Sequence, residues 1–201
     1  VESIAGGLPG VLDITKTKII AAANLSDWTH KPLAQDLTSI FSCPVRLEND
    51  TALGALGEAK EGAGKDCNSV AYVAVGTGIG GAWVLNGELM QGSYSFDIGH
   101  QVVDVNGPLC PACSKPGHLE SYIKEPDFQN YFMVGLYNTL LNWPVEVLVL
   151  GGGVIFHSDW KIDDVETNVH ELIKLHSDNV KVKIAELGDE AGLHGALRIL
   201  S

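Results

Sequence analysis

Two apolar segments near the middle of the chain flank a turn that is rich in glycine. Residues 69–75 (SVAYVAV) and 82–87 (AWVLNG) contain the β-branched and aromatic residues that strands favour, and GTGIGG (76–81) lies between them. This arrangement predicts a β-hairpin whose first strand is buried. Because an isolated hairpin is at best marginally stable in water, this feature constrains the fold more than any other segment does.

The other segments alternate between the periodicity of strands and that of helices. Pro32 suits the first turn of a helix, and a Pro-Gly turn at 9–10 follows the first predicted strand. Strands that alternate with helices indicate an α/β protein. Strands are predicted at residues 1–7, 44–49, 145–150 and 180–187, helices at 32–41, 51–62, 129–142, 163–176 and 191–200, and a loop-rich segment at 88–118.

The composition limits the classes of function. The chain has 201 residues, of which 45% are hydrophobic, and this is enough to bury a core in one or two lobes. Its net charge is -12 and it has no cluster of Lys and Arg, which argues against nucleic acid as a partner. No apolar run approaches the ~20 residues of a membrane span, and the first residues do not resemble a secretory leader. We therefore expect neither a membrane nor a nucleic-acid partner.

Four side chains that can bind zinc lie in and beside the predicted loop. Cys110 and Cys113 form a Cys-x2-Cys pair, His118 follows a Lys-Pro-Gly turn, and His100 precedes the loop. Zinc prefers four nitrogen or sulfur ligands in a tetrahedron, and four protein ligands indicate a structural site. Two buried cysteines beside two surface histidines are the alternative. Cysteines used for a metal suit a reducing compartment, so we expect a cytoplasmic protein.

Glycine turns follow two of the predicted strands, at 76–81 and at 151–153. Without a Cβ, the backbone N–H groups of such turns can approach a phosphate. The turn at 76–81 lacks the sequence of a Walker loop, and it does not open a helix as the dinucleotide-binding turn does. A hairpin turn without a ligand and simple tight packing are the alternatives.

The stretch LEND (47–50) ends a predicted strand and begins a predicted helix. Asp50 is then either the ordinary N-cap of that helix or a general base that faces a cleft. In the second interpretation, Asn49 orients a substrate hydroxyl. Glu48 is predicted to be solvated.

In this order, the motifs resemble those of the ROK family (repressors, open reading frames and sugar kinases) over most of the chain. The segments that carry the resemblance are GLPGVLD (7–13), LENDTALGALGEAKEGAG (47–64), VAYVAVGTGIGGAWVLNGELMQGS (70–93), IGHQVVDVNGPLCPACSKPGHLESY (98–122), VEVLVLGGGV (145–154) and GLHGAL (192–197). The resemblance implies the two-lobed actin-like ATPase (ribonuclease H-like) fold. The remainder of the N-terminal lobe would occupy 1–68 and the C-terminal lobe 69–201, with the last helix packing back on the first lobe.

The resemblance also implies roles for individual residues. Asp50 matches the catalytic base, which takes a proton from a sugar hydroxyl. The positions that match sugar-binding residues are Asn49, Asp97, His100 and Glu120. The positions that match ATP-binding residues are Gly76, Thr77, Gly78 and Gly80 for the phosphates, and Gly151, Gly152 and Gly153 near the adenosine. The metal ligands would be His100, Cys110, Cys113 and His118, with His100 binding zinc through one ring nitrogen and the sugar through the other.

The function that the resemblance implies is the ATP-dependent phosphorylation of a hexose, first of all glucose, with Mg²⁺ accompanying ATP. Fructose, mannose, N-acetylhexosamines and polyphosphate are alternative substrates. The alternative functions are a sugar-responsive repressor, which carries a helix-turn-helix segment before the kinase-like part, and a sugar-binding relative without catalysis. Many members of the family are dimers, so a homodimer is an expectation as well.

The chain departs from the family pattern at four places. Asp97 stands where the family usually has Glu, and its side chain is one methylene shorter. The usual Cys-x-Cys-x4-Cys motif is replaced by Cys110-x2-Cys113-x4-His118, which predicts a Cys2His2 site because histidine also binds zinc. The opening strand and Asp-x-Gly-Gly-Thr loop of the family do not precede residue 1, and the segment after Tyr122 is compressed. We expect that the sequence omits parts of a longer protein, and a reduced, inactive relative is the alternative.

Overall fold

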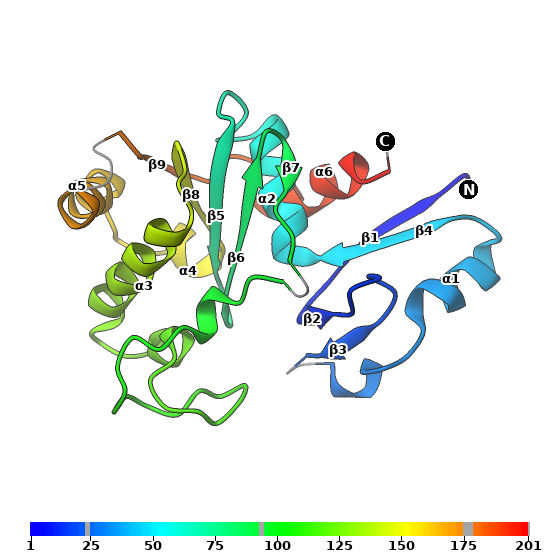
Figure 1. Ribbon diagram of the computed structural model, residues 1–201, viewed down its shortest axis with the longest axis horizontal. Coiled ribbons are helices and arrows are strands. Elements are labelled where there is room, and N and C mark those ends of the chain that lie inside the picture. The colour runs from blue at the N-terminus through cyan, green and yellow to red at the C-terminus, as the bar shows by residue number, and fades with distance from the viewer. Residues whose placement is uncertain (23–24, 93–94, 175–178, 201) are drawn as a thin grey trace.

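The computed structural model describes residues 1–22, 25–92, 95–174 and 179–200, and Figure 1 shows its arrangement. The elements alternate as the sequence predicts, so the expected α/β class is confirmed. The strands are β1 (Ile4–Leu8), β2 (Val11–Leu12), β3 (Ile19–Ala21), β4 (Val45–Asn49), β5 (Ser69–Val75), β6 (Ile79–Leu85), β7 (Glu88–Leu89), β8 (Val147–Gly151) and β9 (Lys181–Ile184). The helices are α1 (Leu33–Phe41), α2 (Asp50–Glu61), α3 (Phe128–Asn142), α4 (Gly153–Phe156), α5 (Ile162–Ile173) and α6 (Ala191–Arg198).

The largest sheet has the strand order β7-β6-β5-β8-β9. The predicted hairpin β5–β6 is antiparallel, whereas β5, β8 and β9 run parallel to one another. Separately, β1 pairs with β4 in a parallel two-stranded sheet, and β2 pairs with β3. Because β5 and β8 are parallel, the glycine turns that follow them lie at the same edge of the sheet.

Helices cover both faces of the large sheet (Figure 1), and each face packs in an apolar core. Alternate residues of β5 point to opposite faces. Val73 packs in one core with Phe132 of α3 and Val165 of α5, and Tyr72 packs in the other core with Ala55 of α2. A fully buried side chain such as Phe132 contributes about 1.5–3 kcal/mol relative to an exposed one. Helix α2, which carries LEND at its start, is therefore fixed against the sheet.

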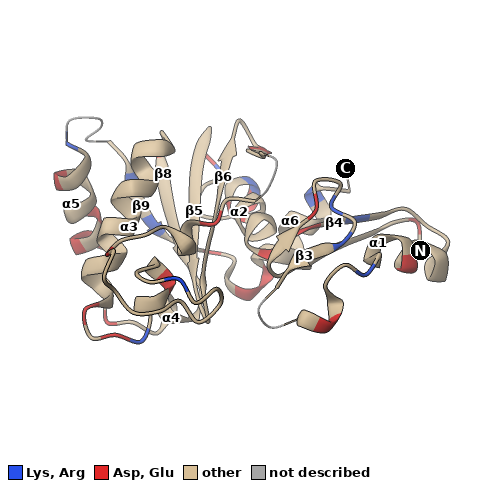
Figure 2. Ribbon diagram, turned by 60° about the horizontal axis from the view of Figure 1, so that its bottom comes forward, with Lys and Arg blue, Asp and Glu red and all other residues tan. Residues whose placement is uncertain are grey.

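Helix α6 packs against α2 and also contacts β1. The division of the chain into lobes at 68/69 stays a prediction. Acidic residues are spread over the surface, with several of them on α5 (Figure 2). None of the helices in the described ranges combines the length and the hydrophobicity that a membrane span requires.

The structure corrects some predicted boundaries. The glycine turn is shorter than 76–81, because the ladder of β5 and β6 extends to the pair Val75↔Ile79. Gly80 therefore lies in a strand rather than in the turn, and the turn is limited to residues 76–78. The short helix α4 after the second glycine turn was not predicted. The end of the helix predicted at 163–176 falls on residues outside the described ranges, and α5 ends at Ile173.

Candidate active site

The junction of β4 and α2, here named the base corner (residues 45–52), positions Asn49 and Asp50. The N-cap of α2 is Asn49, whose Oδ1 accepts a hydrogen bond of 3.0 Å from the Ala52 backbone N–H. Its Nδ2 donates to the Gly10 carbonyl at 3.1 Å, which ties the corner to the turn after β1. The interpretation of Asp50 as the N-cap is thus wrong, because the preceding amide already fills that role.

Asp50 is the first residue of α2, and its Oδ1 accepts a hydrogen bond of 2.8 Å from the Thr51 backbone N–H. The residue as a whole is exposed, but Gly7 of β1 lies directly against its Cα and Cβ. Partial removal of water by these neighbours raises the pKa of the Asp50 carboxyl above its usual range, and the hydrogen bonds from Thr51 oppose the shift. A carboxylate with a raised pKa at an accessible position is suited to act as a base.

The turn between β5 and β6 lies between Asp50 and the cysteine-containing segment. A side chain at Gly80 would collide with the Thr51 hydroxyl, so the start of β6 can approach α2 only as glycine. A Cβ at Gly78 would lie 3.1 Å from Glu120 Oε2. The hairpin therefore contacts the base corner through the start of β6 and Glu120 through its turn.

The turn at 151–153 lies beside the first turn, because Ala74 of β5 pairs with Gly151 of β8. Gly152 has a φ of +90° and sits against the Val75 carbonyl, so a side chain is excluded there. By contrast, a Cβ at Gly76 or Gly153 would meet nothing within 4 Å. Open backbone at the carboxyl ends of parallel strands is where α/β proteins usually bind ligands.

The Cys/His loop (residues 100–118) brings the four predicted zinc ligands together. Their ligand atoms all lie within 4.8 Å of one another. Cys110 Sγ is 3.8 Å from His100 Nε2, and Cys113 Sγ is 3.3 Å from His118 Nδ1. Two thiols and two imidazoles at these separations fit a tetrahedral zinc ion, whose ligand bonds are about 2.0–2.3 Å long.

His100 directs its two ring nitrogens to different groups. Nε2 lies on the cysteine side, 3.0 Å from Glu120 Oε1, and Nδ1 lies 3.4 Å from Asp97 Oδ2. Cys110 Sγ also donates to Glu120 Oε1 at 2.9 Å, and burial together with this hydrogen bond raises the pKa of the Cys110 thiol to about 12. Burial raises the pKa of Asp97 as well, although His100 partly offsets it. The predicted sugar residues Asp97, His100 and Glu120 therefore form one hydrogen-bonding and electrostatic cluster.

Glu48 is a residue that the sequence interpretation missed. It is only 5% exposed, so the prediction of a solvated side chain is wrong. Its carboxylate accepts hydrogen bonds from Lys16 Nζ at 2.8 Å, Gln91 Nε2 at 3.0 Å and the Asn49 backbone N–H at 2.8 Å. One buried carboxylate thus connects the base corner to two other segments. No signal in the sequence identifies these partners, because they lie 32 and 43 residues away.

Comparisons with known proteins identify the family to which the chain is similar. The family model of the ROK family matches residues 1–143. A putative xylose repressor from Caldicellulosiruptor sp. is 35% identical over 121 residues, which cover 59% of this chain and 30% of that protein. The glucokinase of Thermotoga maritima is 34% identical over 131 residues, which cover 64% of this chain and 41% of that protein. The chain thus matches less than half of the length of either relative.

A solved structure shows the same fold over nearly the whole chain. The crystal structure of a ROK family glucokinase from Streptomyces griseus, in complex with glucose and AMPPNP, has a TM-score of 0.83 and 23% identity. The likeness covers 99% of this chain and 81% of that one. The expected actin-like ATPase fold is therefore confirmed.

Proposed function

The chain belongs to the ROK family, and we propose that it phosphorylates a hexose with ATP, with glucose as the first candidate. The observation that carries this proposal is the position of Asp50. Its carboxyl has a raised pKa and lies at the same edge of the molecule as the two open glycine turns. A base beside two turns that can hold a nucleotide is the arrangement that phosphoryl transfer to a hydroxyl requires.

In the proposed reaction, Asp50 accepts the proton of the sugar hydroxyl as that oxygen attacks the γ-phosphate. The backbone N–H groups of the turn at 76–78 approach the phosphates, and Gly151, Gly152 and Gly153 accommodate the adenosine side. Gly80, which lies in β6, contributes by letting this turn approach Thr51. Mg²⁺ accompanies ATP and supplies the counter-charge that the phosphates need. Most of the rate enhancement then comes from alignment and charge stabilisation.

The sugar would lie between Asn49 and the cluster of Asp97, His100 and Glu120. Carboxylates and an imidazole that face a common space can bind several hydroxyls at once. Zinc held by the Cys/His loop would take no part in the chemistry and would keep His100 and Glu120 in place. His100 Nε2 lies on the metal side, which leaves Nδ1 beside Asp97 for the sugar side. Because Asp97 is shorter than the usual Glu, this position is where the choice of sugar should differ from that of other family members.

The test is the release of ADP by the purified chain with Mg-ATP against a panel of hexoses and N-acetylhexosamines. Asp50→Asn should lower turnover about 10²–10⁴-fold, the range that general-base catalysis contributes, and should leave sugar binding intact. Asp36→Asn is a matched control, because Asp36 lies in the first turn of the exposed helix α1. Retained turnover in the Asp50 variant would contradict the role of the base.

The pH dependence gives a second readout of the same residue. The pKa of Asp50 is raised, so its base form is lost at a higher pH than for an ordinary aspartate. Turnover should therefore fall as the pH drops through this raised pKa, and it should be constant above it.

A second candidate function is sugar binding without catalysis, as the ligand-sensing part of a repressor. The similarity to a xylose repressor, at 35% identity, favours it as much as the similarity to a glucokinase favours the kinase. Calorimetric titration with xylose and glucose in the absence of ATP distinguishes the two. Sugar binding with no ADP release for any sugar would support the second candidate.

A further inference from the structure

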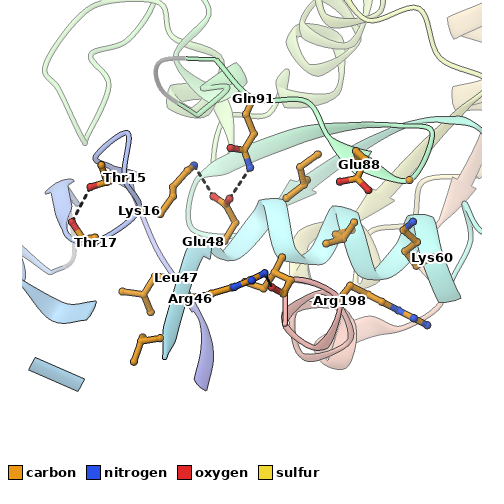
Figure 3. Close-up of a pocket in the computed structure, with 15 residues that line it drawn as sticks. Thr15, Lys16, Thr17, Arg46, Leu47, Glu48, Lys60, Glu88, Gln91 and Arg198 are labelled. Carbon is orange, nitrogen blue, oxygen red and sulfur yellow. Dashed lines mark hydrogen bonds and ion pairs between the residues drawn. The ribbon is translucent and has the colours of Figure 1, made fainter. Parts of the chain in front are cut away.

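A cavity of the protein shares β4 with the candidate active site but is lined by neither Asp50 nor the Cys/His loop. It has a volume of about 580 Å³ and is bounded by β4, the later part of α2, the β6–β7 turn and the end of α6 (Figure 3). Among the described residues that line it are Glu48, Lys60, Glu88 and Arg198, and Asp50 and the zinc ligands are not among them. Its volume lies in the range of about 300–1,000 Å³ that is typical of small-molecule sites.

The lining of this cavity is unusually basic for so acidic a protein. Four of the fifteen lining residues are Lys or Arg, whereas the whole chain has thirteen among 201 residues with a net charge of -12. Fifteen residues drawn at random would include about one, so cations are enriched about fourfold. They come from four separate parts of the chain, and are Lys16, Arg46 of β4, Lys60 of α2 and Arg198 of α6.

Only part of this positive charge is neutralised by the walls of the cavity. Lys16 pairs with Glu48 at 2.8 Å. Arg198 pairs with Glu61, which does not line the cavity. Arg46 donates to the Ile199 carbonyl, and neither Arg46 nor Lys60 forms an ion pair within the described part of the chain. The remaining acidic group of the lining is Glu88, so the cavity retains an excess of positive charge.

Neutral polar groups complete the lining. Thr15, Thr17 and Gln91 lie at the side of the cavity where Glu48 and Lys16 meet, and Arg198 and Lys60 extend from the other side (Figure 3). Arginine and lysine recognise phosphate, whereas hydroxyl, amide and carboxylate groups recognise sugar hydroxyls. One cavity thus offers cations on the side of Lys60 and Arg198 and a mixture of polar groups on the side of Glu48 and Gln91.

We propose that this cavity binds a phosphorylated sugar of about the size of a hexose monophosphate. Its phosphate contacts Arg46, Lys60 and Arg198, and its hydroxyls contact the end formed by Thr15, Thr17 and Gln91. The site is separate from the turns proposed for ATP. Binding here does not depend on the proposed kinase activity, because it requires only the cavity and its charges.

Isothermal titration calorimetry with glucose 6-phosphate and with inorganic phosphate tests the proposal. The unmodified chain should bind glucose 6-phosphate more tightly than inorganic phosphate. The double variant Arg46→Gln, Lys60→Gln should weaken the binding of glucose 6-phosphate about tenfold or more, since it removes two charge-assisted contacts. The control Lys31→Gln, Lys65→Gln neutralises two exposed lysines outside the cavity and should leave the affinity unchanged.

Two further variants test whether the ligand occupies this cavity. Asp97→Asn alters the proposed sugar site and does not line this cavity, so it should bind glucose 6-phosphate as the unmodified chain does; loss of binding there would place the ligand in the candidate active site and overturn the proposal. Lys60→Gln alone keeps the bond from Arg46 to the Ile199 carbonyl, so it tests the site if the double variant fails to fold. The proposal would also be overturned if glucose 6-phosphate did not bind, if the substitutions in the cavity left its affinity unchanged, or if both anions bound with equal affinity.

Discussion

The base corner and the Cys/His loop face the same candidate site, but they are held in different ways. The base corner is a strand that continues into a capped helix, and this helix is packed on the large sheet. The Cys/His loop contains isolated bridges, such as Val102↔His118, and single backbone hydrogen bonds, such as that from the Gly117 N–H to the Pro108 carbonyl, and its four candidate ligands point at one another. We therefore predict that the position of Asp50 is independent of a metal, whereas the position of His100 depends on a metal ion that bridges the thiols and imidazoles.

The largest loss of stability in the helix that carries the base corner should come from a substitution at the far end of α2. Glu58 is fully buried, and its carboxylate accepts hydrogen bonds from the backbone N–H groups of Ala63, Glu186 and Leu187. Glu58→Gln places an NH₂ group against some of these donors. The free energy of unfolding should fall by about 3 kcal/mol, because each unsatisfied buried group costs about 1–3 kcal/mol.

Urea denaturation measures this change, and Glu61→Gln is the matched control on the same helix. Glu61 pairs with Arg198 and His194 at the surface, so its replacement should leave the midpoint nearly unchanged. Equal effects of the two substitutions would show that the end of α2 is not held by Glu58.

The Cys/His loop should respond to loss of its metal ligands without a change in the base corner. We expect one zinc ion per chain, and Cys110→Ser or Cys113→Ser should remove it. Sugar affinity should then fall about 10–100-fold, the range seen when the support of a metal site is lost. Elemental analysis, sugar titration and limited proteolysis within residues 101–118 measure these effects together.

Cys67→Ser is the control for this prediction, because Cys67 lies against the core on the other face of the sheet. It should keep both the zinc and the sugar affinity. A purified protein without zinc, or Cys110 and Cys113 variants that retain it, would contradict the ligand set.

The smallest loss of stability should come from replacing Asn49, the N-cap in the base corner. Asn49→Ala removes the acceptor for the Ala52 N–H, and the expected loss of stability is about 1 kcal/mol. Asn49→Ser keeps a capping oxygen and should restore most of this stability, which thermal denaturation can measure. If sugar affinity falls equally in both variants, the amide of Asn49 has a role in binding beyond that of a cap.

Much of the fold and of the site could be predicted from local patterns. Helix α2 begins at Asp50 and ends at Glu61, close to the predicted boundaries. The signals that begin and end it, the N-cap and the final glycines, lie directly beside those boundaries in the sequence. The four candidate zinc ligands could be chosen because three of them lie within nine residues and their chemistry is specific. Whether Asp50 or Asn49 caps α2 could not be predicted, since both residue types are good caps.

The order of strands and helices along the chain, the glycine turns and the donors of the candidate metal site follow from the amino-acid sequence, because each depends on residues that are close together in the chain. Three other features required the folded chain: the burial of Glu48 between Lys16 and Gln91, the passage of Gly80 against Thr51, and the four cations that line one cavity. These features depend on which distant segments approach one another. A charged residue in an alternating strand has the same local pattern whether it meets water or a buried partner.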